Sequence, residues 1–117
     1  VKEEVQRLVN KHKNEEISIT VTGHSLGAAL ATLSALDIAR NLNIPNDQPS
    51  KASCPVTAFL FASPRVGNYE FRKIFNNEFK DNNLQLRALR IRNKKDSVPK
   101  LPCRLIPLGF TCMVLDQ

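Results

Sequence analysis

The sequence predicts an α/β fold in which parallel strands are joined by crossover helices. Segments with helical and strand periodicity alternate in regular order along the chain, as the repeating units of such folds do. The segment 56–62 is an almost continuous apolar run, which is typical of a strand covered on both faces in a parallel sheet. A turn that contains Gly23 and Gly27 joins a β-branched segment to an alanine-rich one. A strand followed by a tightly packed helix is the simplest structure for that pattern.

The first predicted elements are an amphipathic helix over residues 1–14 and a strand over 17–22. The strand is β-branched at five of its six positions, and strict alternation places Ile17, Ile19 and Val21 on one face. His12 continues the apolar stripe of the helix by one turn, so we expect a half-buried residue at the helix end and not a catalytic base. The stripe itself consists of residues spaced as one face of a 3.6-residue period: Val1, Val5, Leu8 and Val9.

The remaining segments predict two further helix–strand units. The alanine-rich segment 28–40 is a strong helix former, and a surface loop with two prolines follows it. After the strand at 56–62, apolar residues at successive fours predict a helix over 69–79: Phe71, Phe75 and Phe79. Alternation over 84–92 predicts the third strand, and 93–99 reads as a loop.

The length of 117 residues bounds the chain to one domain or part of one. A sheet with helices on both faces normally needs more residues than this, and the first residue is Val1. No element of either period can be assigned to residues 103–117. We therefore expect an incomplete fold, with one partial domain over 1–102 and a divergent or truncated tail over 103–117.

The composition excludes some classes of function. The net charge is +6 and the isoelectric point about 9.6, and such a basic surface attracts anionic partners such as phospholipid head groups. The alternative is a solvated basic surface without a partner. No RNA-binding or zinc-finger pattern accompanies the basic residues, so we expect no nucleic-acid partner. Charged or polar residues interrupt every apolar run, so we expect no transmembrane segment.

The three cysteines do not form a recognisable framework. Cys54, Cys103 and Cys112 are odd in number and widely spaced, which matches neither a set of disulfides nor a paired metal site. Reduced thiols favour an intracellular protein, so we expect a cytoplasmic location.

The strongest functional signal is Gly23-His24-Ser25-Leu26-Gly27. A Gly-x-Ser-x-Gly turn between a strand and a helix exposes the serine to a substrate carbonyl, and it predicts Ser25 as a nucleophile. The turn is tight, so the residues two before and two after the serine are expected to be small. The backbone N–H of Leu26, at the start of the helix, is the expected oxyanion donor. The alternative is a glycine-rich turn without a catalytic role.

A serine hydrolase triad also needs an acid and a histidine, in the chain order serine, acid, histidine. Asp96 follows the third predicted strand and is the candidate acid, although an aspartate beside Ser97, Val98 and Pro99 is also ordinary turn chemistry. The other aspartates considered lie on a helix or in connecting loops and are poorer candidates: Asp37, Asp47 and Asp81. His12 precedes the nucleophile, His24 adjoins it, and no histidine follows Asp96. The general base is therefore absent from these residues.

Over residues 1–102 the sequence resembles the plant type II phospholipase A1 group within the class 3, fungal lipase-like, lipases of the α/β-hydrolase type. The resemblance implies a serine hydrolase that cleaves acyl esters of glycerolipids, at the sn-1 position of phospholipids. It implies Ser25 as nucleophile, Asp96 as acid and no metal or organic cofactor. Three blocks carry it: 17–39, with Thr20-Val21-Thr22-Gly23-His24-Ser25-Leu26-Gly27-Ala28; 55–71, with Phe61-Ala62-Ser63-Pro64-Arg65-Val66-Gly67-Asn68; and Leu89-Arg90-Ile91-Arg92-Asn93 followed by Asp96-Ser97-Val98-Pro99.

The sequence departs from the family pattern on both sides of these blocks. It lacks the upstream part with the second oxyanion donor and the lid, and the downstream part with the catalytic histidine. Two hypotheses follow: part of a phospholipase A1 that works at a membrane surface, or a catalytically inactive truncated fragment or lipid-binding remnant. In either case we expect the 117-residue chain alone to hydrolyse no ester. We also expect it to aggregate through uncovered apolar residues such as Phe59 and Phe61.

Overall fold

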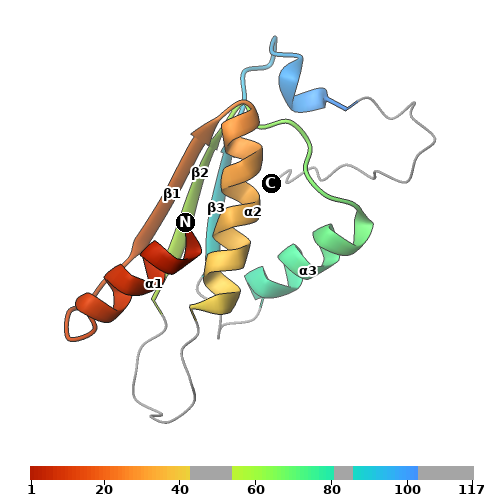
Figure 1. Cartoon of the computed structure of the whole chain (residues 1–117). Coiled ribbons are helices and arrows are strands. Elements are labelled where there is room, and N and C mark those ends of the chain that lie inside the picture. Colours follow the sequence, from red (N-terminus) through yellow and green to blue (C-terminus); the bar gives the residue numbers. More distant parts are fainter. Residues whose placement is uncertain (43–53, 81–85, 103–117) are drawn as a thin grey trace.

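A computed structural model describes residues 1–42, 54–80 and 86–102, and Figure 1 shows their arrangement. Helices and strands alternate in the predicted order. The elements are α1 (Lys2–Lys11), β1 (Ile19–His24), α2 (Leu26–Asn41), β2 (Val56–Phe61), α3 (Tyr69–Lys80), β3 (Leu86–Ile91) and a short 3₁₀ helix, η1 (Val98–Lys100). Among these residues no helix is both long enough and apolar enough to cross a membrane.

The three strands form one parallel sheet in the order β1-β2-β3. Ile19 pairs with Val56 and Val56 with Leu86, so the strands begin at the same edge of the sheet. Parallel crossovers are nearly always right-handed, so a strand order that advances in one direction places successive helices on the same face. Figure 1 shows α2 lying along the sheet. The predicted α/β class is therefore confirmed.

The core lies between the sheet and the helices that cover it. The alanine-rich face of α2 is buried, with Ala28 and Ala35 fully inaccessible, because small side chains let the helix approach the strands closely. α1 contributes Val9 and α3 contributes Phe75 to the same cluster. The inward residues of the sheet complete it: Val56, Ala58, Leu60 and Leu86.

The opposite face of the sheet is open in the described part of the chain. Along β2, Val56, Ala58 and Leu60 are buried, whereas Phe59 and Phe61 keep 36% and 41% of their surface exposed. The open face also carries the half-exposed Leu89 and Ile91 of β3. The prediction that segment 56–62 is covered on both faces is thus confirmed for one face only, because the helices of the described residues pack on that face.

Several predicted boundaries shift. α1 ends at Lys11 and not at residue 14, because His12 takes a non-helical conformation and its ring binds the Glu15 carboxylate at 2.9 Å. His12 is half-buried, as expected. Of the predicted stripe, Val5 and Val9 pack on the core, whereas Val1 and Leu8 are exposed.

The first strand lies over Ile19–His24 rather than 17–22. Pairing with β2 decides this, because the ladder starts at Ile19–Val56 and continues through Gly23 and His24. Ile19 and Val21 share the inward face, as predicted. α2 begins two residues before the predicted start at 28, and β3 begins at Leu86. Several predictions concern positions outside the described residues: the proline-containing loop, the tail over 103–117, and the sites Asp47, Asp81, Cys103 and Cys112.

Candidate active site

Ser25 is the single residue between β1 and α2. Its backbone has φ 53° and ψ −126°, a region that non-glycine residues seldom adopt and that costs about 1–3 kcal/mol. Two sets of contacts hold it there. Its amide donates to the Phe61 carbonyl at the end of β2 (2.9 Å), and its carbonyl accepts the amides of Ala28 and Ala29 at 3.0 and 3.3 Å. The predicted sharp strand-to-helix turn is therefore present.

Gly23 is required by this turn. A Cβ on Gly23 would collide with the carbonyl of Gly27 and lie 2.7 Å from the amide nitrogen of Ala28. The strand and the returning helix thus approach too closely for any side chain. At Gly27, by contrast, a Cβ would meet no described atom within 4 Å. The prediction that both glycines must be small is confirmed for Gly23 and wrong for Gly27, which lies on the exposed side of the first helical turn.

Directly after Ser25, α2 begins with two amides that have no hydrogen-bond acceptor among the described residues. The first helix amides that donate a hydrogen bond are those of Ala28 and Ala29, and both donate to the Ser25 carbonyl. The N–H groups of Leu26 and Gly27 precede them, and a helix offers such groups no internal acceptor. A serine at a helix start commonly accepts a bond from the second or third amide. The Ser25 side chain makes no such capping bond, so its hydroxyl is not consumed by the helix.

Asp96 lies between β3 and η1. Its Oδ1 accepts the amide of Val98 at 2.9 Å, and its own amide donates to the Asn93 carbonyl at 3.0 Å. The turn role that the sequence allowed is therefore present. It is compatible with a triad role, because the turn uses only Oδ1. Among the described residues no hydrogen bond reaches Oδ2, and the side chain is half-buried.

Ser25 and Asp96 follow the carboxyl ends of β1 and β3. His24, Phe61 and Ile91 pair across the sheet, so these strand ends lie at one edge. The ends of β1 and β3 are two strand spacings apart, about 9.5 Å, with the end of β2 between them. Figure 1 shows η1 (blue) beyond the same edge of the sheet as the start of α2.

Neither histidine of the sequence lies between these two residues. His12 follows α1, precedes β1 and binds Glu15. Figure 1 shows α1 beside the end of the sheet opposite to the start of α2. His24 is exposed on the open face of β1, because it alternates with the inward Val21 and Gly23. The structure therefore brings the expected nucleophile and acid to one edge of the sheet. His12 lies away from this edge, whereas His24 lies at it but is exposed on the open face of β1. Asp37, the poorer candidate on α2, binds Asn41 at 2.7 Å.

The structure adds residues that the sequence did not single out. Arg90, on β3, donates from one guanidinium nitrogen to the carbonyls of Ser63 and Pro99 at 2.6 and 3.0 Å. Ala62, directly after β2, has a positive φ of 50°. The sequence did offer one signal for Arg90: it is a charged residue at a position of the third strand where the alternation predicts an inward, apolar side chain. The described residues contain no group of three or more side chains of the types that ligate metals.

Known proteins resemble this chain over nearly its whole length. The family model for lipase (class 3) matches residues 1–105. Phospholipase A1-IIgamma of Arabidopsis thaliana is 55% identical over 109 residues, which are 92% of this chain and 24% of that protein. Phospholipase A1-II 6 of Oryza sativa subsp. japonica is 54% identical over 101 residues, 85% of this chain and 24% of that protein. The chain thus spans about a quarter of the length of these curated relatives.

Solved structures agree with the family. The mono- and diacylglycerol lipase from Aspergillus oryzae superposes with a TM-score of 0.59 at 31% identity, over 86% of this chain and 30% of that one. Lipase II from Rhizopus niveus gives the same TM-score at 27% identity, over 85% of this chain and 32% of that one. Both are lipases, so their sheets place the three parallel strands seen here within an α/β-hydrolase fold. The chain belongs to the class 3 lipase family.

Proposed function

We propose that the protein hydrolyses acyl esters of glycerolipids by means of a serine nucleophile, Ser25. The observation that carries this proposal is the strained position of Ser25 between β1 and α2, with a hydroxyl that caps no helix amide. Attack of its Oγ on the ester carbonyl would form a tetrahedral intermediate with negative charge on the former carbonyl oxygen. The Leu26 amide at the start of α2 would donate to that oxygen, an interaction that typically contributes about 2.7–4 kcal/mol.

Asp96 would be the acid of the triad. Its Oδ2 would accept the ring N–H of an imidazole placed between the two strand ends, and its charge would stabilise that imidazole when protonated. The proton of Ser25 would pass to the other ring nitrogen and then to the alcohol, which leaves as its ester C–O bond breaks. A water molecule would then attack the acyl-serine, with the same imidazole as base, and release the fatty acid and free Ser25. No histidine of these 117 residues lies at that position, so the base is not among them.

The relatives' name, phospholipase A1, supports a phospholipid substrate. We propose that cleavage occurs at the sn-1 ester, on a membrane surface that the enzyme contacts peripherally. The Aspergillus structure is named for mono- and diacylglycerols, which differ by lacking a charged head group. The basic net charge of +6 favours the anionic surface of a phospholipid bilayer. The alternative is lipid binding without turnover, which the same basic charge would also serve.

The decisive experiment supplies the rest of the enzyme. Residues 1–102 replace the matching segment of Arabidopsis phospholipase A1-IIgamma, and this chimera is assayed on phosphatidylcholine vesicles with a labelled sn-1 chain. We expect release of the sn-1 fatty acid, and a loss of activity in Ser25→Ala that leaves at most the roughly 10³–10⁴-fold residual catalysis known for disabled triads. An inactive but folded chimera, or an active Ser25→Ala variant, would contradict the proposal.

The 117-residue chain by itself is expected to be inactive on a short-chain nitrophenyl ester. Hydrolysis by the purified chain that disappears in Ser25→Ala would show that a base is present after all. Binding of the chain to phospholipid vesicles without hydrolysis, together with an inactive chimera, would favour the lipid-binding alternative.

A further inference from the structure

Arg90 joins two loops at the edge of the sheet where Ser25 and Asp96 lie. Its Nη2 donates to the carbonyl of Ser63, in the loop after β2, at 2.6 Å, and to the carbonyl of Pro99, in η1, at 3.0 Å. Ser63 and Pro99 are buried, and Arg90 is half-buried. One cationic group therefore ties the segment that follows β2 to the segment that follows the candidate acid.

Short backbone contacts connect this tie to both functional residues. On one side, Ser25 donates to Phe61, two residues before Ser63. On the other side, Asp96 accepts the amide of Val98, next to Pro99. The path from nucleophile to acid thus passes through the Arg90 side chain, and each step is a hydrogen bond or one or two peptide units.

The far end of η1 is held separately. The Arg65 amide donates to the Leu101 carbonyl at 2.7 Å, and its guanidinium reaches the Pro102 carbonyl at 3.3 Å. With that end attached, the Arg90–Pro99 bond fixes where the first residues of η1 sit relative to the sheet. The turn at Asp96 precedes this point directly, so its position depends on the bond.

We propose that Arg90 is a positioning residue for Asp96, which sets the distance between the acid and Ser25. The inference rests on the proposed hydrolase function. Arg90 does not touch the substrate; its planar guanidinium acts by bridging two carbonyls that come from separate loops. A lysine has one ammonium on a flexible stem, so it can reach one or both carbonyls without the same fixed geometry.

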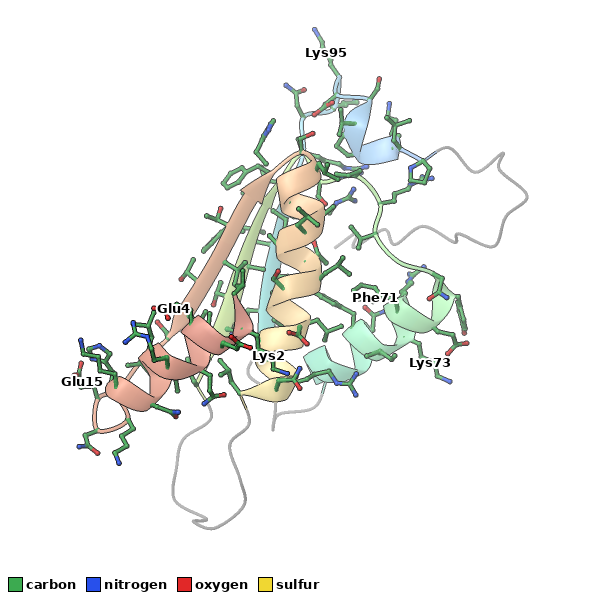
Figure 2. The ribbon with its side chains drawn as sticks, viewed as in Figure 1. Lys2, Glu4, Glu15, Phe71, Lys73 and Lys95 are labelled. Atoms are coloured by element: carbon green, nitrogen blue, oxygen red, sulfur yellow. The ribbon has the colours of Figure 1, made fainter. Side chains whose placement is uncertain are left out.

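Two residues offer matched controls. Arg87 is an arginine on the same strand, exposed and near its opposite end. Lys95 is a cation in the same loop as Asp96, and Figure 2 shows its side chain pointing away from the sheet. Removing either charge changes the net charge as much as removing that of Arg90, without breaking the bridge.

The test uses the chimera on phosphatidylcholine vesicles. We expect Arg90→Met to lower kcat about 10²-fold, the size of effect that a displacement of about 1 Å produces, with KM unchanged within about twofold. Arg90→Lys should recover part of kcat, and Arg87→Met and Lys95→Met should match the unsubstituted chimera. The acid limb of the pH–kcat/KM profile should move to lower pH in Arg90→Met, because a displaced carboxylate stabilises the protonated base less. Circular dichroism spectra and thermal melts confirm the folded fraction.

An unchanged kcat in Arg90→Met, or a fall no larger than the loss of folded protein with an unmoved pH profile, would overturn the proposal. If the unsubstituted chimera is inactive, the proposed function fails and a second measurement decides the positioning role. Hydrogen exchange of the folded but inactive chimera is then followed at the Val98 amide, which Asp96 holds. Faster exchange in Arg90→Met than in Arg87→Met supports the bridge, and equal rates contradict it.

Discussion

Replacing Gly23 or Gly27 with alanine adds one methyl group to the serine turn in each case. Comparing the stability of the two variants separates the effect of steric crowding from the effect of helix propensity. In Gly23→Ala the new Cβ would lie 2.5 Å from the Gly27 carbonyl carbon and 2.7 Å from the Ala28 nitrogen, all backbone atoms. Unstrained contacts between carbon atoms are about 3.5–4.0 Å, so α2 must retreat by roughly 1 Å. α2 supplies the largest share of the buried cluster, so its displacement loosens the core.

The expected cost of Gly23→Ala is at least about 3 kcal/mol, the upper end of ordinary overpacking, because no flexible side chain can yield. Gly27→Ala adds the same methyl group to an exposed position of α2, where a Cβ meets no described atom. Alanine is favoured over glycine inside a helix by up to about 1 kcal/mol, so this variant should be neutral or slightly more stable.

The assay is urea unfolding of the two chimera variants, followed by circular dichroism at the same protein concentration. The free energies of unfolding should differ by at least about 3 kcal/mol, with Gly23→Ala the less stable. If the two variants agree within about 0.5 kcal/mol, the close approach of β1 and α2 is not what selects glycine at position 23. Equal destabilisation of both would restore the view that the turn demands a small residue on each side of Ser25.

Two further outcomes are expected of the 117-residue chain itself. It should self-associate through the open sheet face, and Phe61→Ser with Leu89→Lys should reduce light scattering; a soluble monomer with a sharp thermal transition would argue against this. Burial raises the pKa of the Cys54 thiol above its ordinary 9.0. Half-maximal alkylation of Cys54, followed by mass spectrometry of the labelled peptide, should therefore need a higher pH in the folded chain than in urea. The small contribution of the buried thiol to stability should be lost as the pH rises above 9.0. The same midpoint in both conditions would contradict the raised pKa.

Element types were predictable because they depend on neighbours in the chain. The β-branched run, the alanine-rich segment and the phenylalanine stripe each reflect a local periodicity, and each gave the expected strand or helix. Element ends were less predictable, since pairing with another strand decides them. β1 extends to His24 because Phe61 lies opposite, a contact between residues far apart in the chain.

The serine turn shows the same division within five residues. The motif identified Ser25 from its neighbours and its place between strand and helix, and Asp96 from its place after the third strand. Nothing in the motif distinguishes its two glycines. Only Gly23 lies where the returning helix passes within contact distance of the strand, so only the tertiary structure assigns it the steric role.

The sequence by itself determined the α/β class, the serine turn, the candidate acid and the absence of a histidine after it, because each follows from residue types and their spacing. The tertiary structure decided which sheet face is covered and that Ser25 and Asp96 share one edge. It also revealed that Arg90 bridges Ser63 and Pro99. These facts depend on distances between segments that are remote in the chain, and such distances are set by how the helices and strands pack.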